Sequence, residues 1–168
     1  MSDEELILIP TDPHFLPSTE QVEQAISALS SAWPDAKLRV IHGSKQSWEW
    51  ETPPSVLVQV ITRDKVDFVH GFENFMAVFC PRCESEIDRD AWDRAMNRAH
   101  ERDYADLSFE TPCCGFRTNL NSLRYDWPAG FAKFSLTMMN SGRDLDNETV
   151  NQIGVALGCD LRKVQAHI

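Results

Sequence analysis

Four of the five cysteines stand in two tight pairs, Cys-Pro-Arg-Cys at 80–83 and Cys-Cys at 113–114. A Cys-Pro-x-Cys pair after an apolar strand forms a tight turn that points both sulfurs at one spot, and Pro81 fixes its own φ, which reduces the entropy lost when the turn is ordered. Two converging pairs supply the tetrahedral sulfur shell that zinc prefers, with zinc–sulfur distances of about 2.3 Å. The sequence therefore predicts a structural Zn²⁺ bound by Cys80, Cys83, Cys113 and Cys114.

Adjacent cysteines are an unusual half of such a site, because both sulfurs reach one metal only if the backbone bends sharply between them. Pro112 before the pair and Gly115 after it permit that bend. Two alternatives stay open. One is three sulfurs with His100, on the intervening helix, as a substitute ligand. The other is four free thiols that pack as small apolar side chains, which the close pairing disfavours. Cys159 stands alone at a turn and is predicted to be structural.

The motifs Cys80-Pro-Arg-Cys83 and Pro112-Cys-Cys-Gly115 resemble the knuckles of zinc-ribbon domains, over residues 75–120. The first motif matches the ribbon pattern, whereas the adjacent cysteines of the second depart from the usual Cys-x-x-Cys. This resemblance implies a zinc-ribbon-like unit. The string LRYDWPAGF at 123–131 is also similar to segments of uncharacterised bacterial proteins with a similar cysteine arrangement, a likeness that attaches no activity to the chain.

The sequence signatures of zinc-dependent catalysis are missing. A catalytic zinc keeps one coordination position open near a general base, whereas four thiolates saturate the ion. The pair His100-Glu101 lacks the spacer of the zinc deaminase motif, and neither His-Glu-x-x-His nor a phosphate-binding glycine-rich loop occurs. We therefore expect a protein that is not an enzyme.

The enzyme alternative is a thiol–disulfide oxidoreductase that uses the Cys-Pro-Arg-Cys motif at 80–83. In thioredoxin-like proteins a helix begins at such a motif and lowers the pKa of the first thiol. Here Glu84, Glu86 and Asp88 follow the motif at once, and carboxylates raise the pKa of a nearby thiol. The apolar stripe of the next helix begins only near Trp92. Both features favour a metal site over redox chemistry.

The charge balance bears on the partner of the protein. The chain has 26 acidic and 16 basic residues, a formal net charge of −10 at pH 7. Because nucleic-acid binding draws on Lys and Arg that neutralise phosphates, we expect no nucleic-acid partner. An acidic surface suits a basic protein partner, for example a toxin masked by an immunity or antitoxin-type protein, although it also serves solubility alone.

Trp48 and Trp50 offer a second candidate surface for a protein partner. On an edge strand both indoles would share one face and form a binding hot spot. The alternative is that they cover the core from a loop.

The predicted localisation rests on two features that the sequence lacks, a membrane span and a signal peptide. No run of about 18 apolar residues occurs, so we expect no membrane span. The acidic start Met-Ser-Asp-Glu-Glu has neither the basic region nor the apolar stretch of a signal peptide. We expect a cytoplasmic protein, where thiols stay reduced and clustered cysteines bind metal. The oligomeric state is left open.

Hydrophobic patterns predict two strand–helix–strand units, one near each end of the chain. The first has strands at 6–9 and 38–42 around a helix that begins at Ser18 with a capping-box pattern. The second has a strand through 134–138, a helix capped by Asp146, and a strand at 161–168. Between the units we expect further elements: strands at 56–61 and 66–69 joined by a turn at 63–65, a strand at 75–79, a helix with buried Trp92, Ala95, Met96 and Ala99, and a hairpin over 107–120.

Two such units can pair into a four-stranded antiparallel sheet backed by two helices, the ferredoxin-like split βαβ arrangement. We therefore predict an α+β fold in one compact domain with three parts. Residues 1–71 form the first βαβ half with extra strands, 72–125 a zinc-ribbon-like insertion with a helix and a hairpin, and 126–168 the second half.

Overall fold

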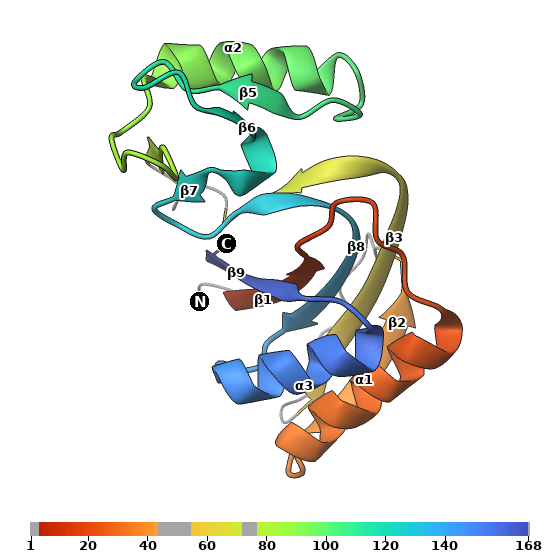
Figure 1. Cartoon of the computed structure of the whole chain (residues 1–168). Coiled ribbons are helices and arrows are strands. Elements are labelled where there is room, and N and C mark those ends of the chain that lie inside the picture. Colours follow the sequence, from red (N-terminus) through yellow and green to blue (C-terminus); the bar gives the residue numbers. More distant parts are fainter. Residues whose placement is uncertain (1–3, 44–54, 72–76, 168) are drawn as a thin grey trace.

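A five-stranded sheet carries two helices on one face and continues at one end into a smaller part with a third helix (Figure 1). This computed structural model describes residues 4–43, 55–71 and 77–167. Within these ranges the strand order is β2-β3-β8-β1-β9. The strands are β1 (Glu4–Pro10), β2 (Lys37–His42), β3 (Ser55–Val69), β8 (Gly130–Met139) and β9 (Leu161–His167).

The two helices on the sheet begin where the sequence predicts. Helix α1 (Thr19–Ala32) starts with a complete capping box, in which Gln21 N–H donates to Ser18 Oγ and Ser18 N–H donates to Gln21 Oε1. At α3 (Asn147–Leu157), Thr149 N–H donates to Asp146 Oδ1 over 2.7 Å, and Gly158 ends the helix at a φ of 82°. No helix in the described ranges is both long and apolar enough to span a membrane.

Replacing Ser18 with Ala is expected to lower the free energy of unfolding by about 1 kcal/mol, because Gln21 N–H at the start of α1 loses its side-chain acceptor. Thermal unfolding measures this as a fall in Tm of about 2–4 °C. Ser30→Ala is the matched control, since Ser30 lies on the exposed face of the same helix. Equal shifts for the two variants would contradict the capping role.

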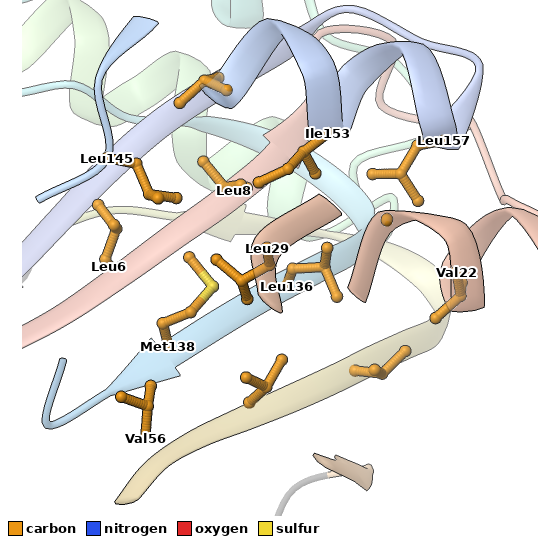
Figure 2. Packing of buried hydrophobic residues seen from close by; sticks show 14 of the residues in the cluster. Leu6, Leu8, Val22, Leu29, Val56, Leu136, Met138, Leu145, Ile153 and Leu157 are labelled. Carbon is orange, nitrogen blue, oxygen red and sulfur yellow. The ribbon is translucent and has the colours of Figure 1, made fainter. Parts of the chain in front are cut away.

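The main hydrophobic core lies between the sheet and the two helices, as Figure 2 shows for side chains from both layers. Alternate strand residues point toward the helices, so Leu136 and Met138 of β8 lie in this core with Leu29 of α1 and Ile153 of α3. The buried members of the cluster are Leu6, Leu8, Val22, Ala25, Leu29, Trp33, Val56, Val58, Val60, Phe134, Leu136, Met138, Leu145, Val150, Ile153 and Leu157.

The predicted antiparallel sheet is wrong in one pairing, because the sheet is mixed. Strand β2 pairs in parallel with β3, from Lys37 opposite Ser55 to His42 opposite Val60. The pairs β3–β8, β8–β1 and β1–β9 are antiparallel. The fold is therefore α+β with a five-stranded mixed sheet in the described ranges.

The predicted turn at 63–65 is also wrong, since β3 runs as one strand of 15 residues. The register with β8 shifts between Thr62 and Asp67, which is the irregularity that accommodates the polar triplet. Arg63 spans the shift, with an ion pair of 3.5 Å to Asp67 and a hydrogen bond of 3.2 Å to Ser135 Oγ. An irregularity of this kind interrupts the register without ending the strand, so turn-like residues do not require a turn.

The cysteine-bearing part of the chain lies at the far end of β3 and β8 (Figure 1). Val69 and Gly130, the last residue of β3 and the first of β8, face each other, so the chain leaves and re-enters the sheet at one place. The elements in between are β4 (Val78–Phe79), α2 (Arg89–His100), β5 (Ser108–Glu110), β6 (Arg117–Asn119), the 3-10 helix η2 (Leu120–Ser122) and β7 (Arg124–Tyr125).

These short elements share a second hydrophobic core, which we call the α2 core. The predicted helix with Trp92, Ala95, Met96 and Ala99 on its buried face is confirmed, and so is the hairpin β5–β6. Of the predicted strand at 75–79, residues 78–79 form β4, which pairs with β7, and residues 75–76 lie outside the described residues. The division of the chain at 72 and 125 stays a prediction. The α2 core consists of Val66, Val78, Cys80, Ile87, Trp92, Ala95, Met96, Ala99, Phe109, Leu120, Leu123, Tyr125, Ala129 and Phe131.

Candidate metal centre

The sulfur atoms of four cysteines meet at one point beside the α2 core. All four Sγ atoms lie within 4.8 Å of one another. The Sγ atoms of Cys80 and Cys114 are 3.7 Å apart, and those of Cys83 and Cys113 are 3.3 Å apart. A tetrahedral ion with bonds of about 2.3 Å needs its sulfurs about 3.8 Å apart. One metal ion can therefore contact all four cysteines with only small adjustments of the side chains.

The first turn follows β4 and is closed by main-chain hydrogen bonds. Cys80 N–H donates to Ser85 O over 2.9 Å, and Glu84 N–H donates to Cys80 O over 3.0 Å. Ile87 N–H donates to Val78 O, which closes the ladder below the turn. Arg82 N–H points at the sulfur itself, 3.4 Å from Cys80 Sγ. Cys80 is fully buried, whereas Cys83 at the other end of the turn is exposed.

The second turn joins β5 to β6 and repeats the main-chain bonds of the first. Thr111 N–H donates to Phe116 O over 2.9 Å, and Gly115 N–H donates to Thr111 O over 2.9 Å. A proline holds the second position of both turns, at Pro81 and Pro112. In this register Thr111 corresponds to Cys80, and Cys114 corresponds to Cys83. Cys113 takes the place of Arg82, a position that carries no sulfur in the first turn.

The fifth position of both turns has a positive φ, 60° at Glu84 and 66° at Gly115. A side chain there costs about 1–2 kcal/mol, partly offset by the greater freedom of unfolded glycine. Glu84→Gly is therefore expected to raise the free energy of unfolding by about 0.5–1 kcal/mol. Gly115→Ala, the same change in reverse, should lower it by about 1 kcal/mol. Denaturant titration of the metal-loaded protein measures both, and shifts of the same sign would contradict the correspondence.

The thiols of the cluster differ in acidity before any metal binds. Burial alone would raise the pKa of Cys80, but the N–H groups of Cys83 and Arg82 and the Thr111 hydroxyl outweigh it and lower that pKa to about 6. Hydrogen bonds from Ser85 lower the pKa of Cys83. The Cys113 sulfur is partly removed from water and lies next to the Cys83 sulfur. Both effects raise the pKa of Cys113, to about 11. A cation would favour all four thiolates, so metal binding is expected to release protons.

The remaining predicted site residues lie elsewhere or outside the described residues. His100 is the last residue of α2, exposed, with its ring centroid 5.7 Å from that of Tyr104. Among the described residues, the group that could hold a metal consists of the four cysteines without His100. Cys159 is half-buried and packs against the main core. Trp48 and Trp50 lie outside the described residues.

Sequence reasoning missed Thr111, whose hydroxyl lies against two of the sulfurs. The signal was present, because the strings CPRCE at 80–84 and TPCCG at 111–115 align position by position. Counting cysteines alone hides that alignment, since only one cysteine occupies the same position in both strings.

Comparison of the chain with protein-family models, curated proteins and solved structures finds no match. The geometry of the chain itself therefore identifies the site. That geometry is a cluster of four cysteines close enough to bind a metal, as a zinc-binding knuckle requires.

Proposed function

We propose that this chain is a non-catalytic zinc-binding protein in which one Zn²⁺ ties two turns of the chain together. The convergence of the Cys80, Cys83, Cys113 and Cys114 sulfurs within 4.8 Å carries the proposal. Thiolates are soft ligands that select zinc over magnesium or calcium, and four of them fill its tetrahedral shell. A filled shell has no position for a reactive water, so the role of the ion is to hold structure.

The position of the cluster supports a structural role. One turn closes the ladder that continues from β4, and the other joins β5 to β6. These strands are two or three residues long, too short to be stable alone. A metal that joins the two turns therefore supplies folding energy that the α2 core needs.

Metal analysis of the purified protein tests this proposal. We expect one zinc ion per chain, and thiols that react with a thiol reagent only after denaturation or chelation. Cobalt substituted for zinc should give the visible absorption of a tetrahedral four-thiolate site, and Cys83→Ser should lose it. A protein that is fully folded without any metal would overturn the proposal.

The second candidate is a thiol–disulfide oxidoreductase, and the pKa of Cys80, lowered to about 6, favours it. Two other observations weigh against it: Cys80 is fully buried, and α2 begins only at Arg89, too late for its dipole to act on the motif. Alkylation of the metal-free protein separates the two. A single fast-reacting Cys80 together with disulfide reductase activity would favour redox chemistry, and alkylation of all four cysteines without such activity favours the metal site.

The partner we propose is a basic protein, bound through the acidic surface beside the first turn. Several acidic side chains of this region already pair with arginine, for example Asp93 with Arg89 and Glu110 with Arg117. Glu84 and Glu86 lie exposed next to the metal-binding turn and form no ion pair within the described ranges. This leaves their charge available for a partner, such as the toxin bound by an immunity or antitoxin-type protein.

Paired pull-downs with the wild-type chain and a Glu84→Lys/Glu86→Lys variant test the partner. A basic protein that the wild type captures at low salt, and that high salt or the charge reversal releases, would support the proposal. Capture of the same protein despite high salt and despite the charge reversal, or retention of nucleic acid by the wild type, would contradict the proposal. A cytoplasmic location is part of the same proposal, because reduced thiols are needed to bind the metal.

We also infer that the sheet is an elaborated ferredoxin-like split βαβ arrangement. Strand β1 connects through α1 and β2 to β3, with β8 between β1 and β3 in the sheet, and β8 connects through α3 to β9, with β1 between them. The parallel strand β2 is the addition to that arrangement. Helices α1 and α3 on opposite faces of the sheet would exclude this arrangement.

A further inference from the structure

The two cysteine turns have the same main-chain hydrogen bonds and differ in their side chains. In each, the fifth residue donates its N–H to the carbonyl of the first, and the first donates its N–H to the carbonyl of the sixth. The first turn has sulfurs at positions one and four, Cys80 and Cys83. The second has them at positions three and four, Cys113 and Cys114, with Thr111 at position one.

Thr111 occupies the place of a ligand and points its hydroxyl at the sulfurs. Its exposed fraction is 1%, close to the 0% of Cys80. Its Oγ1 lies 3.7 Å from Cys80 Sγ and 3.5 Å from Cys114 Sγ. Phe116 N–H donates to the same oxygen over 3.0 Å, which fixes the position of the hydroxyl group.

Metal binding decides the direction of the hydrogen bond between Thr111 and the sulfurs. A free Cys80 thiol can donate its proton to Thr111 Oγ1. A metal-bound thiolate has no proton, so the hydroxyl must then be the donor and the sulfur the acceptor. Because Phe116 N–H already uses one lone pair of the oxygen, the hydroxyl proton remains for the thiolates of Cys80 and Cys114.

We propose that the second turn is a displaced half-site, meaning that one of its two metal-binding sulfurs has moved from position one to position three. Cys113 supplies the sulfur that position one lacks. The Thr111 hydroxyl at position one donates a hydrogen bond that the Cys80 and Cys114 thiolates share. Four thiolates around one divalent ion carry a net charge of −2, and each hydrogen-bond donor aimed at a sulfur disperses part of it. Thr111 is thus a positioning residue that tunes the metal and does not bind it. This inference rests on the proposed zinc site.

The first test compares zinc affinity in Thr111→Val, Thr111→Ser and Thr118→Val by competition with a chelator. Thr111→Val removes the donor at nearly constant volume and should weaken zinc binding by about 10–100-fold, the usual effect of losing a partner of a metal ligand. It should also shift the sulfur-to-cobalt charge-transfer band of the cobalt form. Thr111→Ser should restore both values, and Thr118→Val, in β6 of the same hairpin, should change neither.

The second test moves the sulfur. Cys113→Ser should lose the four-thiolate cobalt spectrum, and Thr111→Cys/Cys113→Ser should restore it, because both turns then have sulfurs at positions one and four. If the double variant stays as defective as Cys113→Ser, or if Thr111→Val binds zinc like Thr118→Val, the displaced half-site is wrong while the zinc site stands. If the wild type binds no zinc, both proposals fail together.

Discussion

Cys83→Ser is expected to abolish metal binding and to unfold the segment around the α2 core, from Val78 to Tyr125. Serine is close to cysteine in size, but its hydroxyl does not ionise to a thiolate, so the tetrahedral shell stays incomplete. The exposed fraction of Cys83 is high and its packing is slight, so the loss comes from the metal. Metal-binding energy at such a site is folding energy, and β4, β5 and β6 are only two or three residues long, too short to be stable alone.

Cys159→Ser is the matched control, because it makes the same atomic change at a half-buried cysteine outside the cluster. We expect it to keep one zinc per chain and to show only the packing cost of one polar atom. Hydrogen exchange locates the difference between the two variants. Amides of the two turns, such as Thr111 N–H, should lose protection in Cys83→Ser, while those between β1 and β8 keep theirs. Equal thermal shifts and equal zinc content for the two variants would refute the assignment.

The elements set by local signals could be predicted from the sequence. A capping box marks the start of α1, and an aspartate cap and a glycine end mark α3. The stripe of Trp92, Ala95, Met96 and Ala99 predicts which face of α2 is buried. These signals act within a few residues, so they can be recognised in the sequence without knowledge of the rest of the fold.

The pairing of strands could not be predicted in the same way. The parallel contact of β2 with β3 joins strands whose connection, 44–54, carries no pattern that fixes a direction. The polar triplet at 63–65 resembles a turn, yet Val66 is buried in the α2 core and Arg63 hydrogen-bonds Ser135 on β8. Such tertiary contacts keep β3 continuous across the shift in register, and local propensity cannot reveal them.

The candidate site could also be predicted only in part, because residue spacing identifies its cysteines whereas the tertiary structure decides its other members. Spacing alone grouped the four cysteines, because each pair is local and each lies at a turn. It could not decide between His100 and a fourth sulfur, since that depends on where α2 ends relative to the turns. It also missed Thr111, whose place follows only from the shared main-chain hydrogen bonds of the two turns.

Arg162 joins the sheet to the residues that follow the cysteine-bearing hairpin β5–β6. Its Nη1 donates to Ala129 O over 2.6 Å and to Asn121 Oδ1 over 3.1 Å, and its Nη2 donates to Asn121 O over 3.0 Å. Asn121 in turn accepts from Phe131 N–H and donates to Thr11 O. Burial lowers the pKa of Arg162, and no ion pair links its guanidinium to a carboxylate within the described ranges. The main-chain carbonyls of Asn121 and Ala129 and the side-chain amide oxygen of Asn121 therefore stabilise this half-buried cation.

Arg162→Met is expected to lower the free energy of unfolding by about 2–4 kcal/mol, because it keeps the length of the apolar stem but leaves buried carbonyls of Asn121 and Ala129 without their donors. Thermal unfolding should show a fall in Tm of about 5–15 °C. Arg94→Met, the same change on the exposed face of α2, should shift it little. Zinc content should remain at one per chain, which separates this contact from the metal site. A variant as stable as Arg94→Met would mean that water replaces the guanidinium without cost, and that Arg162 does not hold β9 to Asn121 and Ala129.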